Sequence, residues 1–268
     1  MAQFTVLIPV LNGAELLGEA LASVESQTLT DVRVIVSDNA STDATPEILE
    51  AWRDRVNLRV IRQEKTLPIP THFNALLDAI ETERYMLLCH DDYLADPDAL
   101  RLADIALDEN PDAPAVYCDL AYVNTQRRPL ATRRFDRAAL FSADEAGRET
   151  IRTTRNMFGI PLGVRTAALG AHRYDPRFHY LTDVDLSWSM AKGRNLAHVP
   201  QPLIANRYRA GNTTWSLLGQ ARSEYLAFAK KHGVPLGPLG KARLSARIWT
   251  LNQQKKLFGL YGRMVERR

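Results

Sequence analysis

The sequence has little cysteine and no long apolar run. Its 268 residues include two cysteines, Cys89 and Cys118, and each stands in an apolar segment with the pattern of a strand. We expect both thiols to be buried and reduced, which suits a cytoplasmic protein and excludes a scaffold held by disulfides. No apolar stretch reaches the roughly 18 residues that a membrane-spanning helix needs. Met1-Ala2-Gln3 leads directly into the first predicted strand, so we expect no signal peptide.

The sequence also lacks a glycine-rich loop of the kind that binds phosphates after a first strand. Pro9-Val10-Leu11-Asn12-Gly13 stands at that position. It does not contain the G-x-G-x-x-G pattern of NAD-binding enzymes. It also supplies neither the glycines nor the basic residues with which a sugar nucleotidyltransferase would hold a triphosphate. Both enzyme classes are therefore disfavoured.

Positive charge is concentrated at the C-terminal end of the chain. Residues 239–268 contain eight Lys or Arg and one Glu, a net charge of +7 within a total of +3, which leaves −4 for residues 1–238. A mildly acidic body argues against nucleic-acid binding along the whole chain. Apolar residues recur at helical spacings in the basic segment: Leu244, Ile248, Leu251, Phe258, Tyr261 and Val265. We expect a helix here that either packs on the rest of the chain or a partner subunit, or lies on an anionic membrane.

Short apolar runs alternate with helical patterns over the first 120 residues. The predicted strands are Phe4–Pro9, Val32–Ser37, Leu58–Ile61, Tyr85–Cys89 and Ala115–Cys118. Between them apolar residues recur at helical spacing, and Thr45-Pro46 has the pattern of an N-cap followed by Pro at the first helical position. This alternation predicts an α/β protein with a mostly parallel sheet covered by helices on both faces.

The alternation ends after residue 120. We expect a loop or an excursion from the sheet over the Arg-rich residues 124–137, and a turn at Gly159–Gly163. Further helices are expected over Asp185–Lys192, Trp215–Lys231 and 239–268, and short strands over Leu196–Val199 and Leu203–Tyr208. The glycines and prolines of 233–240 mark the one plausible boundary. The predicted organisation is a domain over 1–232, with halves 1–120 and 121–232, and a basic helical extension over 233–268.

Acidic clusters follow four of the short apolar runs. They are Asp38–Asp43, His90-Asp91-Asp92, Asp119 and Asp183-Val184-Asp185. The carboxyl ends of parallel strands meet at one edge of a sheet, which is where open α/β sheets bind ligands. Carboxylates gathered without paired bases usually need a cation such as Mg²⁺ or Mn²⁺, often one that carries phosphate. The pattern predicts an enzyme that acts on a metal-bound diphosphate.

Five segments occur in the order and spacing of one enzyme family. They are FTVLIPVLN at 4–12, DNASTD at 38–43, Asn74 with ALLDA at 75–79, YMLLCHDDY at 85–93 and, after Tyr174-Asp175, LTDVDLSW at 181–188. Over roughly residues 4–215 the chain resembles family 2 glycosyltransferases. The resemblance implies the A-type glycosyltransferase fold, a Rossmann-like mixed sheet, together with a nucleotide-sugar donor and a divalent metal.

The resemblance implies a donor site at the ends of the first strands. Asp38 would accept a hydrogen bond from the base or the ribose. The other residues expected to bind the donor nucleotide are Pro9, Val10 and Leu11, which would line the base, and Asn12, Asn74 and Asp91. A different interpretation of residues 38–43 is a strand-to-helix turn, since Asp, Asn, Ser and Thr favour such turns.

The same resemblance assigns the metal site to His90-Asp91-Asp92. The family motif is Asp-x-Asp and its first acid is His90 here, so Asp91 and Asp92 would hold Mn²⁺ or Mg²⁺ against the donor diphosphate. Asp92 is expected to be the direct ligand, and Asp91 to contact the ribose or the donor sugar. His90 would either be a third ligand, or orient Asp92 or lie exposed. Alternatively, these acids only precede a helix.

Asp183 matches the catalytic base of the family, although Thr182 replaces the Glu that precedes it there. In an inverting transfer this carboxylate would deprotonate the acceptor hydroxyl on the face opposite the leaving group. The alternative is that Asp183 only complements a helix dipole. Candidate contacts to the diphosphate or the acceptor are His90, Asp119, Arg207 and Arg209, and Gly211 stands where the family often has a His. The Arg127–Arg137 cluster is expected either to be solvated or to meet an anionic acceptor such as a lipid diphosphate.

The sequence therefore predicts an inverting, metal-dependent glycosyltransferase. It would move a sugar from a nucleotide-diphosphate donor, most commonly UDP in this family, to a hydroxyl of a saccharide or lipid-linked acceptor in cell-surface glycan synthesis. The expected location is cytoplasmic, with peripheral attachment to the inner membrane face through 233–268. The departures at His90, Thr182 and Gly211 leave a second hypothesis open, a non-catalytic relative that binds nucleotide or saccharide as a scaffold.

Overall fold

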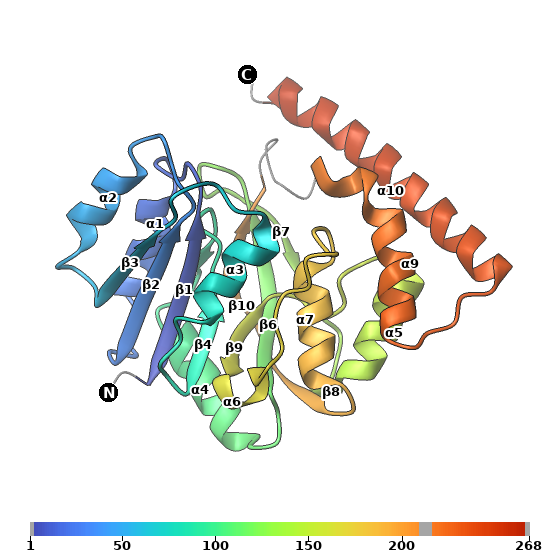
Figure 1. Ribbon diagram of the computed structural model, residues 1–268, viewed down its shortest axis with the longest axis horizontal. Helices are drawn as coiled ribbons and strands as arrows, with labels where there is room; N and C mark the ends of the chain where they lie inside the picture. The colour runs from blue at the N-terminus through green and yellow to red at the C-terminus, as the bar shows by residue number, and fades with distance from the viewer. Residues whose placement is uncertain (1–2, 209–215, 266–268) are drawn as a thin grey trace.

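A mixed sheet with helices on both faces forms the centre of the molecule (Figure 1). The structure, a computed structural model, describes residues 3–208 and 216–265, and of residues 254–265 it describes the backbone alone. The first half of the sheet is parallel, in the spatial order β3-β2-β1-β4; its strands are β1 (Phe4–Val10), β2 (Val32–Asp38), β3 (Leu58–Arg62) and β4 (Arg84–Leu87). All seven residues of β1 are buried, as its continuous apolar run predicts.

Alternate side chains of β1 enter two different cores. Val6 and Ile8 pack on one face with helices α1 (Leu17–Glu25), α2 (Thr45–Trp52) and α4 (Ala99–Glu109). Leu7 packs on the other face with α3 (Ile69–Leu77), α5 (Ala143–Thr153), α7 (Thr182–Ala191) and α9 (Ala221–Lys231). The period of two along the strand therefore places a helical layer on each face of the sheet.

The second half of the sheet mixes parallel and antiparallel strands. β6 (Ala115–Val123) runs parallel to β10 (Asn195–Arg207), and β9 (Pro161–Arg165) lies antiparallel between β4 and β6. β5 (Tyr93–Leu94) pairs antiparallel with β10. Two further strands lie beside this path, β7 (Pro129–Arg133) on β6 and β8 (Leu140–Ser142) on β10. The predicted mixed, mostly parallel sheet flanked by helices is confirmed.

Several local predictions between residues 124 and 208 were wrong. Residues 124–137 are more than a loop, because Pro129–Arg133 form the strand β7. The expected turn at Gly159–Gly163 runs into β9, which begins at Pro161. The two short strands expected over 196–199 and 203–208 are one strand, β10, whose register with β6 is irregular between Val199 and Ile204.

Three element boundaries also differ from prediction, and two of them shape the candidate site. β4 ends at Leu87, so Cys89 lies in the loop that follows and not in the strand. α7 begins earlier than expected, at Thr182, which places Asp183 in its first turn. α2 begins at Thr45 with Ala44 as its N-cap, so Thr45 is not the cap.

Helix α10 (Pro238–Val265) packs on the rest of the protein through its first turns. Leu244 and Ile248 are buried in the same core as Tyr225 of α9. Leu239 and Trp249 are instead 64% and 65% exposed. In the part of the chain that the structure describes, we find no helix whose length and apolar character would let it cross a bilayer.

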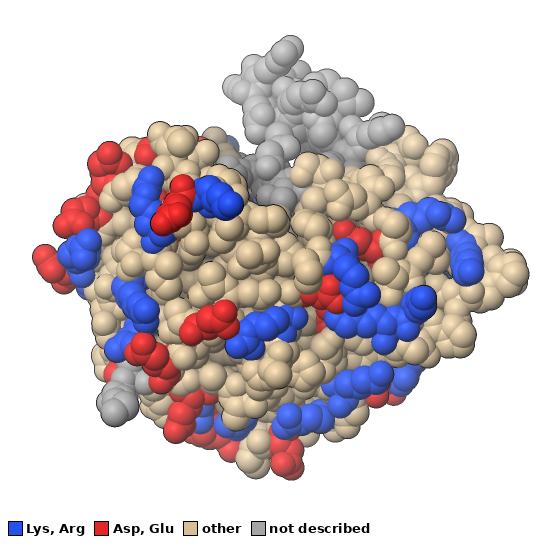
Figure 2. Space-filling view, viewed as in Figure 1, with Lys and Arg blue, Asp and Glu red and all other residues tan. Residues whose placement is uncertain are grey.

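Charged side chains of both signs are interspersed on the face of the molecule shown in Figure 2. Charged side chains of opposite sign also pair at the surface of the protein, for example Arg55 with Glu25 (2.7 Å) and Arg53 with Glu50 (2.8 Å). Mixed charge of this kind differs from the basic stripe that marks a nucleic-acid-binding surface.

Candidate active site

Hydrogen bonds tie together two loops at the carboxyl edge of the sheet. The backbone of the loop after β1 donates to side chains of the loop after β2; the bonds are Asn12 N to Ser41 Oγ (2.9 Å), Gly13 N to Thr45 Oγ1 (2.9 Å) and Ala14 N to Asp43 Oδ2 (3.0 Å). Thr42 N donates in return to Asn12 Oδ1 (2.9 Å). Much of the polar segment after β2 thus builds a turn, as the alternative interpretation of this segment expects.

Asp38 ends β2 at this edge and is buried. Its carboxylate accepts hydrogen bonds from Ser41 N (2.8 Å) and from Arg62 Nη1 (2.5 Å). The Arg62 side chain is half exposed at the end of β3. Each carboxylate oxygen has a second lone pair, so this arrangement is compatible with the expected ribose or base contact.

The other residues expected at the donor nucleotide differ in how open they are. Pro9 and Val10 are buried in β1, whereas Leu11 is 41% exposed beside them and is the one open to a base. The amide of Asn74 donates to Tyr174 O (2.9 Å) and accepts from Tyr174 N (2.8 Å). Asn74 therefore joins α3 to the segment before α7, and its contacts argue against the predicted role in nucleotide binding.

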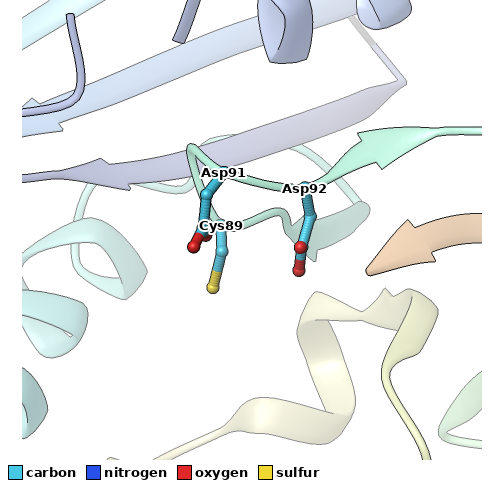
Figure 3. Close-up of side chains that lie close together, drawn as sticks. All are labelled: Cys89, Asp91 and Asp92. Atoms are coloured by element: carbon cyan, nitrogen blue, oxygen red, sulfur yellow. The ribbon is translucent and has the colours of Figure 1, made fainter. Parts of the chain in front are cut away.

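The loop after β4 brings three candidate metal ligands together. Cys89 Sγ and carboxylate oxygens of Asp91 and Asp92 lie within 4.8 Å of one another. Figure 3 shows the three side chains pointing the same way from this loop. The two carboxylates suit a hard ion such as Mg²⁺ or Mn²⁺. The donor set therefore fits a divalent cation, and it includes a sulfur that the sequence analysis placed in a strand.

His90 does not belong to this group of candidate ligands. Its ring packs on the loop after β1, where a Cβ on Gly13 would come within 2.7 Å of His90 Cδ2 and 2.4 Å of Val10 Cγ2. Among the described residues, the group that could hold an ion contains Cys89 and not His90. Of the roles left open for His90, that of a third metal ligand is therefore not supported, because the third candidate ligand beside Asp91 and Asp92 is Cys89.

Asp92 is held in place by β10. It is 5% exposed, and its carboxylate accepts hydrogen bonds from Asn206 Nδ2 (2.9 Å) and Arg207 N (2.8 Å). Burial, together with the charge of Asp91, raises the pKa of Asp92 to about 7 in spite of these bonds. A bound cation would offset the electrostatic repulsion between the carboxylates of Asp91 and Asp92. Asp91 is less buried than Asp92, so the geometry favours Asp91 as the ligand more open to an ion.

Arg207 is not open to a diphosphate. Its side chain is 1% exposed, and its guanidinium donates to Asp91 O (2.9 Å), Thr125 O (2.8 Å) and Glu19 Oε2 (2.7 Å). These bonds join β10, α1 and the loop that holds the candidate metal ligands. Arg207 thus holds the loop of candidate metal ligands in place, which corrects its predicted contact with the diphosphate or the acceptor. Arg209 and Gly211 lie outside the described residues.

Asp183 lines a cleft of about 620 Å³ near the same edge of the sheet. Other residues that line this cleft include Tyr122, Tyr180, Tyr208 and Asn206. Asp183 is exposed to the cleft, while the surrounding protein displaces bulk water, and this desolvation raises its pKa to about 6. It also lies in the first turn of α7, as the dipole interpretation expects. A carboxylate with this pKa is a stronger base than an ordinary Asp.

The cleft and the loop with the candidate metal ligands adjoin each other. Asn206 lines the cleft and also donates to Asp92. Burial and the charges of Asp92, Asp91 and Asp183 raise the pKa of the Cys89 thiol well above its ordinary value. Asp183 is therefore near enough to act electrostatically on this loop, so a candidate base and a candidate cation site lie close together.

Glu224 is a positioning residue that the sequence analysis missed. It is buried in α9, and its Oε2 accepts hydrogen bonds from three successive backbone amides, those of His179 (3.0 Å), Tyr180 (2.8 Å) and Leu181 (3.0 Å). These residues lead directly into α7, so Glu224 fixes the start of the helix that carries Asp183. The bonds join segments far apart in the sequence, and no local pattern signals them.

We expect Glu224→Ala to lower the free energy of unfolding by about 2–5 kcal/mol, because it leaves three amides without their acceptor. Glu224→Gln retains an acceptor oxygen without the charge and should lose less. Urea unfolding followed by circular dichroism measures both, with the exposed residue Glu64 replaced by Ala as the control. If Glu224→Ala and Glu64→Ala were equally stable, these bonds would not hold the start of α7.

Asp119 lies within β6 and does not end a strand. It is buried, and its Oδ1 accepts hydrogen bonds from Phe135 N (2.9 Å) and pairs with His198 Nε2 (3.1 Å). It therefore anchors the segment after β7, which corrects its predicted contact with an acceptor. In the arginine cluster, Arg133 and Arg137 stack on Phe135 at 4.4 Å and 4.3 Å, and the other arginines are exposed.

A family model described as Glycosyl transferase family 2 matches residues 5–175. Among curated proteins, the abequosyltransferase RfbV of Salmonella typhimurium is 31% identical over 130 residues, which cover 45% of this chain and 39% of that protein. The poly(ribitol-phosphate) beta-N-acetylglucosaminyltransferase TarS of Staphylococcus aureus is 32% identical over 113 residues, which cover 41% of this chain and 20% of that protein. The matched part thus spans well under half the length of these relatives.

Solved structures share the fold. Residues 1–349 of S. aureus TarS superpose with a TM-score of 0.65 at 20% identity, covering 92% of this chain and 70% of that one. The same TarS fragment has been solved in complex with UDP-GlcNAc. The mannosyltransferase PcManGT from Pyrobaculum calidifontis, in complex with GDP-Man and Mn²⁺, gives a TM-score of 0.63 at 18% identity, with 92% and 69% covered.

Proposed function

The chain belongs to glycosyl transferase family 2 and is a glycosyltransferase with the A-type fold. On this basis we propose that it is an inverting, metal-dependent enzyme. It moves one sugar from a nucleotide-diphosphate donor to an acceptor hydroxyl. The observation that carries this proposal is that Asp183 and Asn206 line one cleft, and that Asn206 also donates to Asp92 of the group formed by Cys89, Asp91 and Asp92. A base for the acceptor and a cation site for the leaving diphosphate are the two parts that such a transfer needs.

In the proposed reaction the acceptor hydroxyl lies in the cleft against Asp183. The Asp183 carboxylate takes the hydroxyl proton while the acceptor oxygen bonds to the anomeric carbon and the nucleotide diphosphate leaves from the opposite face. A carboxylic acid is far more acidic than an alcohol, so proton transfer is late and coupled to formation of the new bond. A Mg²⁺ or Mn²⁺ ion held by Asp91 and Asp92 would supply the Lewis acid that neutralises the leaving diphosphate.

We propose that the donor nucleotide lies across the ends of β1 and β2. Leu11 offers an exposed apolar side chain to the base, and Asp38, paired with Arg62, offers acceptor oxygens to the ribose or the base. A uridine donor is the first to test, since TarS has been solved with UDP-GlcNAc, and guanosine is the second, since PcManGT has been solved with GDP-Man.

The cleft beside Asp183 suits a saccharide acceptor. Tyr122, Tyr180 and Tyr208 line it, and tyrosine offers a flat apolar face to a sugar ring and a hydroxyl for hydrogen bonding. A volume of about 620 Å³ lies within the usual range for a ligand site. We therefore propose transfer to a saccharide or a lipid-linked saccharide in cell-surface glycan synthesis, with residues 1–120 binding the nucleotide and 121–232 the acceptor.

Thermal unfolding with UDP, GDP and dTDP, each with and without Mn²⁺, tests the donor part of the proposal. We expect one nucleotide to raise the Tm, and to do so only with metal. A ligand at about 100 times its Kd stabilises by about 2.7 kcal/mol, a shift of roughly 5–10 °C for a chain of this size. Mn²⁺ alone is the control. No shift with any nucleotide contradicts the proposal, and a shift without donor hydrolysis or transfer favours the non-catalytic scaffold.

We also propose that residues 233–268 attach the catalytic domain, 1–232, to an anionic membrane surface. Lys241, Arg243 and Arg247 are exposed on α10, and so are the apolar side chains of Leu239 and Trp249. Basic and apolar side chains exposed on one helix are the features that bind it in the interface of an anionic bilayer.

Replacing Lys241, Arg243 and Arg247 together by Gln is expected to weaken binding to vesicles that contain phosphatidylserine. At about 1 kcal/mol for each basic residue near the surface, the loss is about 100-fold. Co-sedimentation measures it, and vesicles of phosphatidylcholine alone are the control. Binding that is unaffected by the triple substitution would leave α10 as a packed helix with no membrane role.

A further inference from the structure

We propose that the cation site of this enzyme has a mixed sulfur and oxygen donor set, in which Cys89 Sγ is a ligand beside Asp91 and Asp92. Such a site binds a thiophilic divalent ion, such as Co²⁺, Zn²⁺ or Cd²⁺, in preference to Mg²⁺. This inference rests on the metal dependence in the proposed function, and it goes beyond it by naming the third donor and the class of ion that the donor selects.

The shape of the loop after β4 places the sulfur among the acids. Asp92 N donates to Cys89 O (3.0 Å), which closes a turn over four residues. Cys89 Sγ and oxygens of Asp91 and Asp92 lie within 4.8 Å of one another, and the three side chains leave the turn on the same side (Figure 3). This limit is close to the sum of a zinc–sulfur and a zinc–oxygen bond, about 4.3–4.5 Å, so a small adjustment of the side chains brings the three atoms around one ion.

Hydrogen bonds hold the backbone of this loop in place. Leu88 N donates to Leu7 O (2.9 Å) just before the turn, and Asp92 is bonded to Asn206 and to the backbone of Arg207 just after it. The side chain of Arg207 also donates to Asp91 O (2.9 Å). The backbone that carries Cys89 is therefore restrained on both sides, and a ligand set on a restrained backbone needs little rearrangement to bind an ion.

The chemistry of the three donors decides which ion is favoured. Carboxylates alone suit Mg²⁺, Ca²⁺ and Mn²⁺, whereas a thiolate selects softer ions such as Zn²⁺. When the sulfur–metal bond forms, the thiol S–H bond breaks and its proton is released to solvent, so binding requires no oxidant or reductant. The other cysteine, Cys118, is fully buried in β6 and lies outside the group of candidate ligands, which makes it a matched control.

Cobalt titration of the full chain tests the donor set directly. Co²⁺ bound to a thiolate gives a sulfur-to-cobalt charge-transfer absorption in the near ultraviolet, whereas Co²⁺ bound only to oxygen does not. We expect this absorption in the unchanged protein and in Cys118→Ser, and its loss in Cys89→Ser. Equilibrium dialysis of the same samples measures how much Co²⁺ is bound.

Competition between ions gives a second readout that does not depend on activity. We expect Cys89→Asp to lower the ratio of Cd²⁺ affinity to Mg²⁺ affinity by at least about 10- to 100-fold. Substitution of residues that only hydrogen-bond a metal ligand already has effects of this size. Bound Co²⁺ without the sulfur absorption, or an absorption that persists in Cys89→Ser, would overturn the proposal and leave an all-oxygen site with the proposed transferase function intact. Absence of Co²⁺ and Mn²⁺ binding, even with UDP or GDP, would overturn both.

Discussion

Asp183→Asn is expected to bind the nucleotide donor as the unchanged protein does and to transfer sugar about 10²–10⁴-fold more slowly. The amide has the size of the carboxylate but cannot take a proton from a hydroxyl in the cleft. Because Asp183 lies on α7 and not in the loop of candidate metal ligands, the metal-dependent rise in Tm with the donor nucleotide should persist. Initial rates of nucleotide release at saturating donor measure the loss.

The pH dependence of the unchanged enzyme is an independent readout for the same residue. With a pKa of about 6, Asp183 is mostly protonated below that pH and ionised above it. A base acts in its ionised form, so the rate of transfer should rise with pH, about tenfold for each unit below 6, and then level off. An acceptor that fills the cleft excludes water and should hold this pKa high in the complex.

Two results would remove Asp183 as the base. One is turnover close to that of the unchanged protein in Asp183→Asn. The other is a rate that falls as the pH rises from 5 to 7. Asp136→Asn, which changes an exposed carboxylate, is the matched control and should keep both the turnover and the rise with pH.

The sheet and the place of the site were predictable because both follow from local patterns. The apolar run of β1 and the carboxylates that follow the early strands are contiguous in sequence, and the parallel order puts Asp38 and the loop after β4 at one edge. Strand β7 was missed for the opposite reason. Its residues are mostly exposed and include Pro129 and Arg133, so it carries no alternation of apolar and polar residues.

Contacts between polar side chains could not be predicted from sequence, since their partners are distant. Asn74 bonds the backbone of Tyr174, and Glu224 bonds the backbone before α7. The guanidinium of Arg207 donates its hydrogen bonds to backbone and carboxylate oxygens of the protein. For Asn74 and Arg207 the family resemblance implied a ligand contact, whereas Glu224 carried no signal at all. In all three cases the partner that the fold supplies sets the role of the residue.

The position of Cys89 shows how a strand boundary alters a prediction about chemistry. The apolar run continues to Cys89, but β4 pairs with β1 only as far as Leu87. Beyond that residue the chain turns, and Cys89 and Asp91 come to the same side of the loop while His90 packs on Gly13. The residue at which the strand ends therefore determines whether the Cys89 thiol or the His90 imidazole lies beside the carboxylates of Asp91 and Asp92.

Asp91→Asn and Asp92→Asn are both expected to abolish the metal-dependent part of donor binding, with a loss of at least about 100-fold, since each removes a proposed direct ligand. The two variants should differ in stability without metal. An amide at position 92 keeps one acceptor oxygen and presents an N–H donor in place of the other, to either Asn206 Nδ2 or Arg207 N. We expect this to lower the free energy of unfolding by about 1–3 kcal/mol. An amide at position 91 removes a charge that opposes ionisation of Asp92.

Asp91→Asn should therefore lose less stability than Asp92→Asn in the absence of metal, and yet gain no Tm from Mn²⁺ with nucleotide. That combination separates a ligand from a structural residue, because loss of a structural residue lowers stability in both conditions. Melting curves with and without Mn²⁺ and nucleotide measure it, and Asp136→Asn is again the control. If Asp91→Asn kept the metal-dependent shift and only Asp92→Asn lost it, Asp92 would be the principal ligand, as the family resemblance implies, despite its bonds to β10.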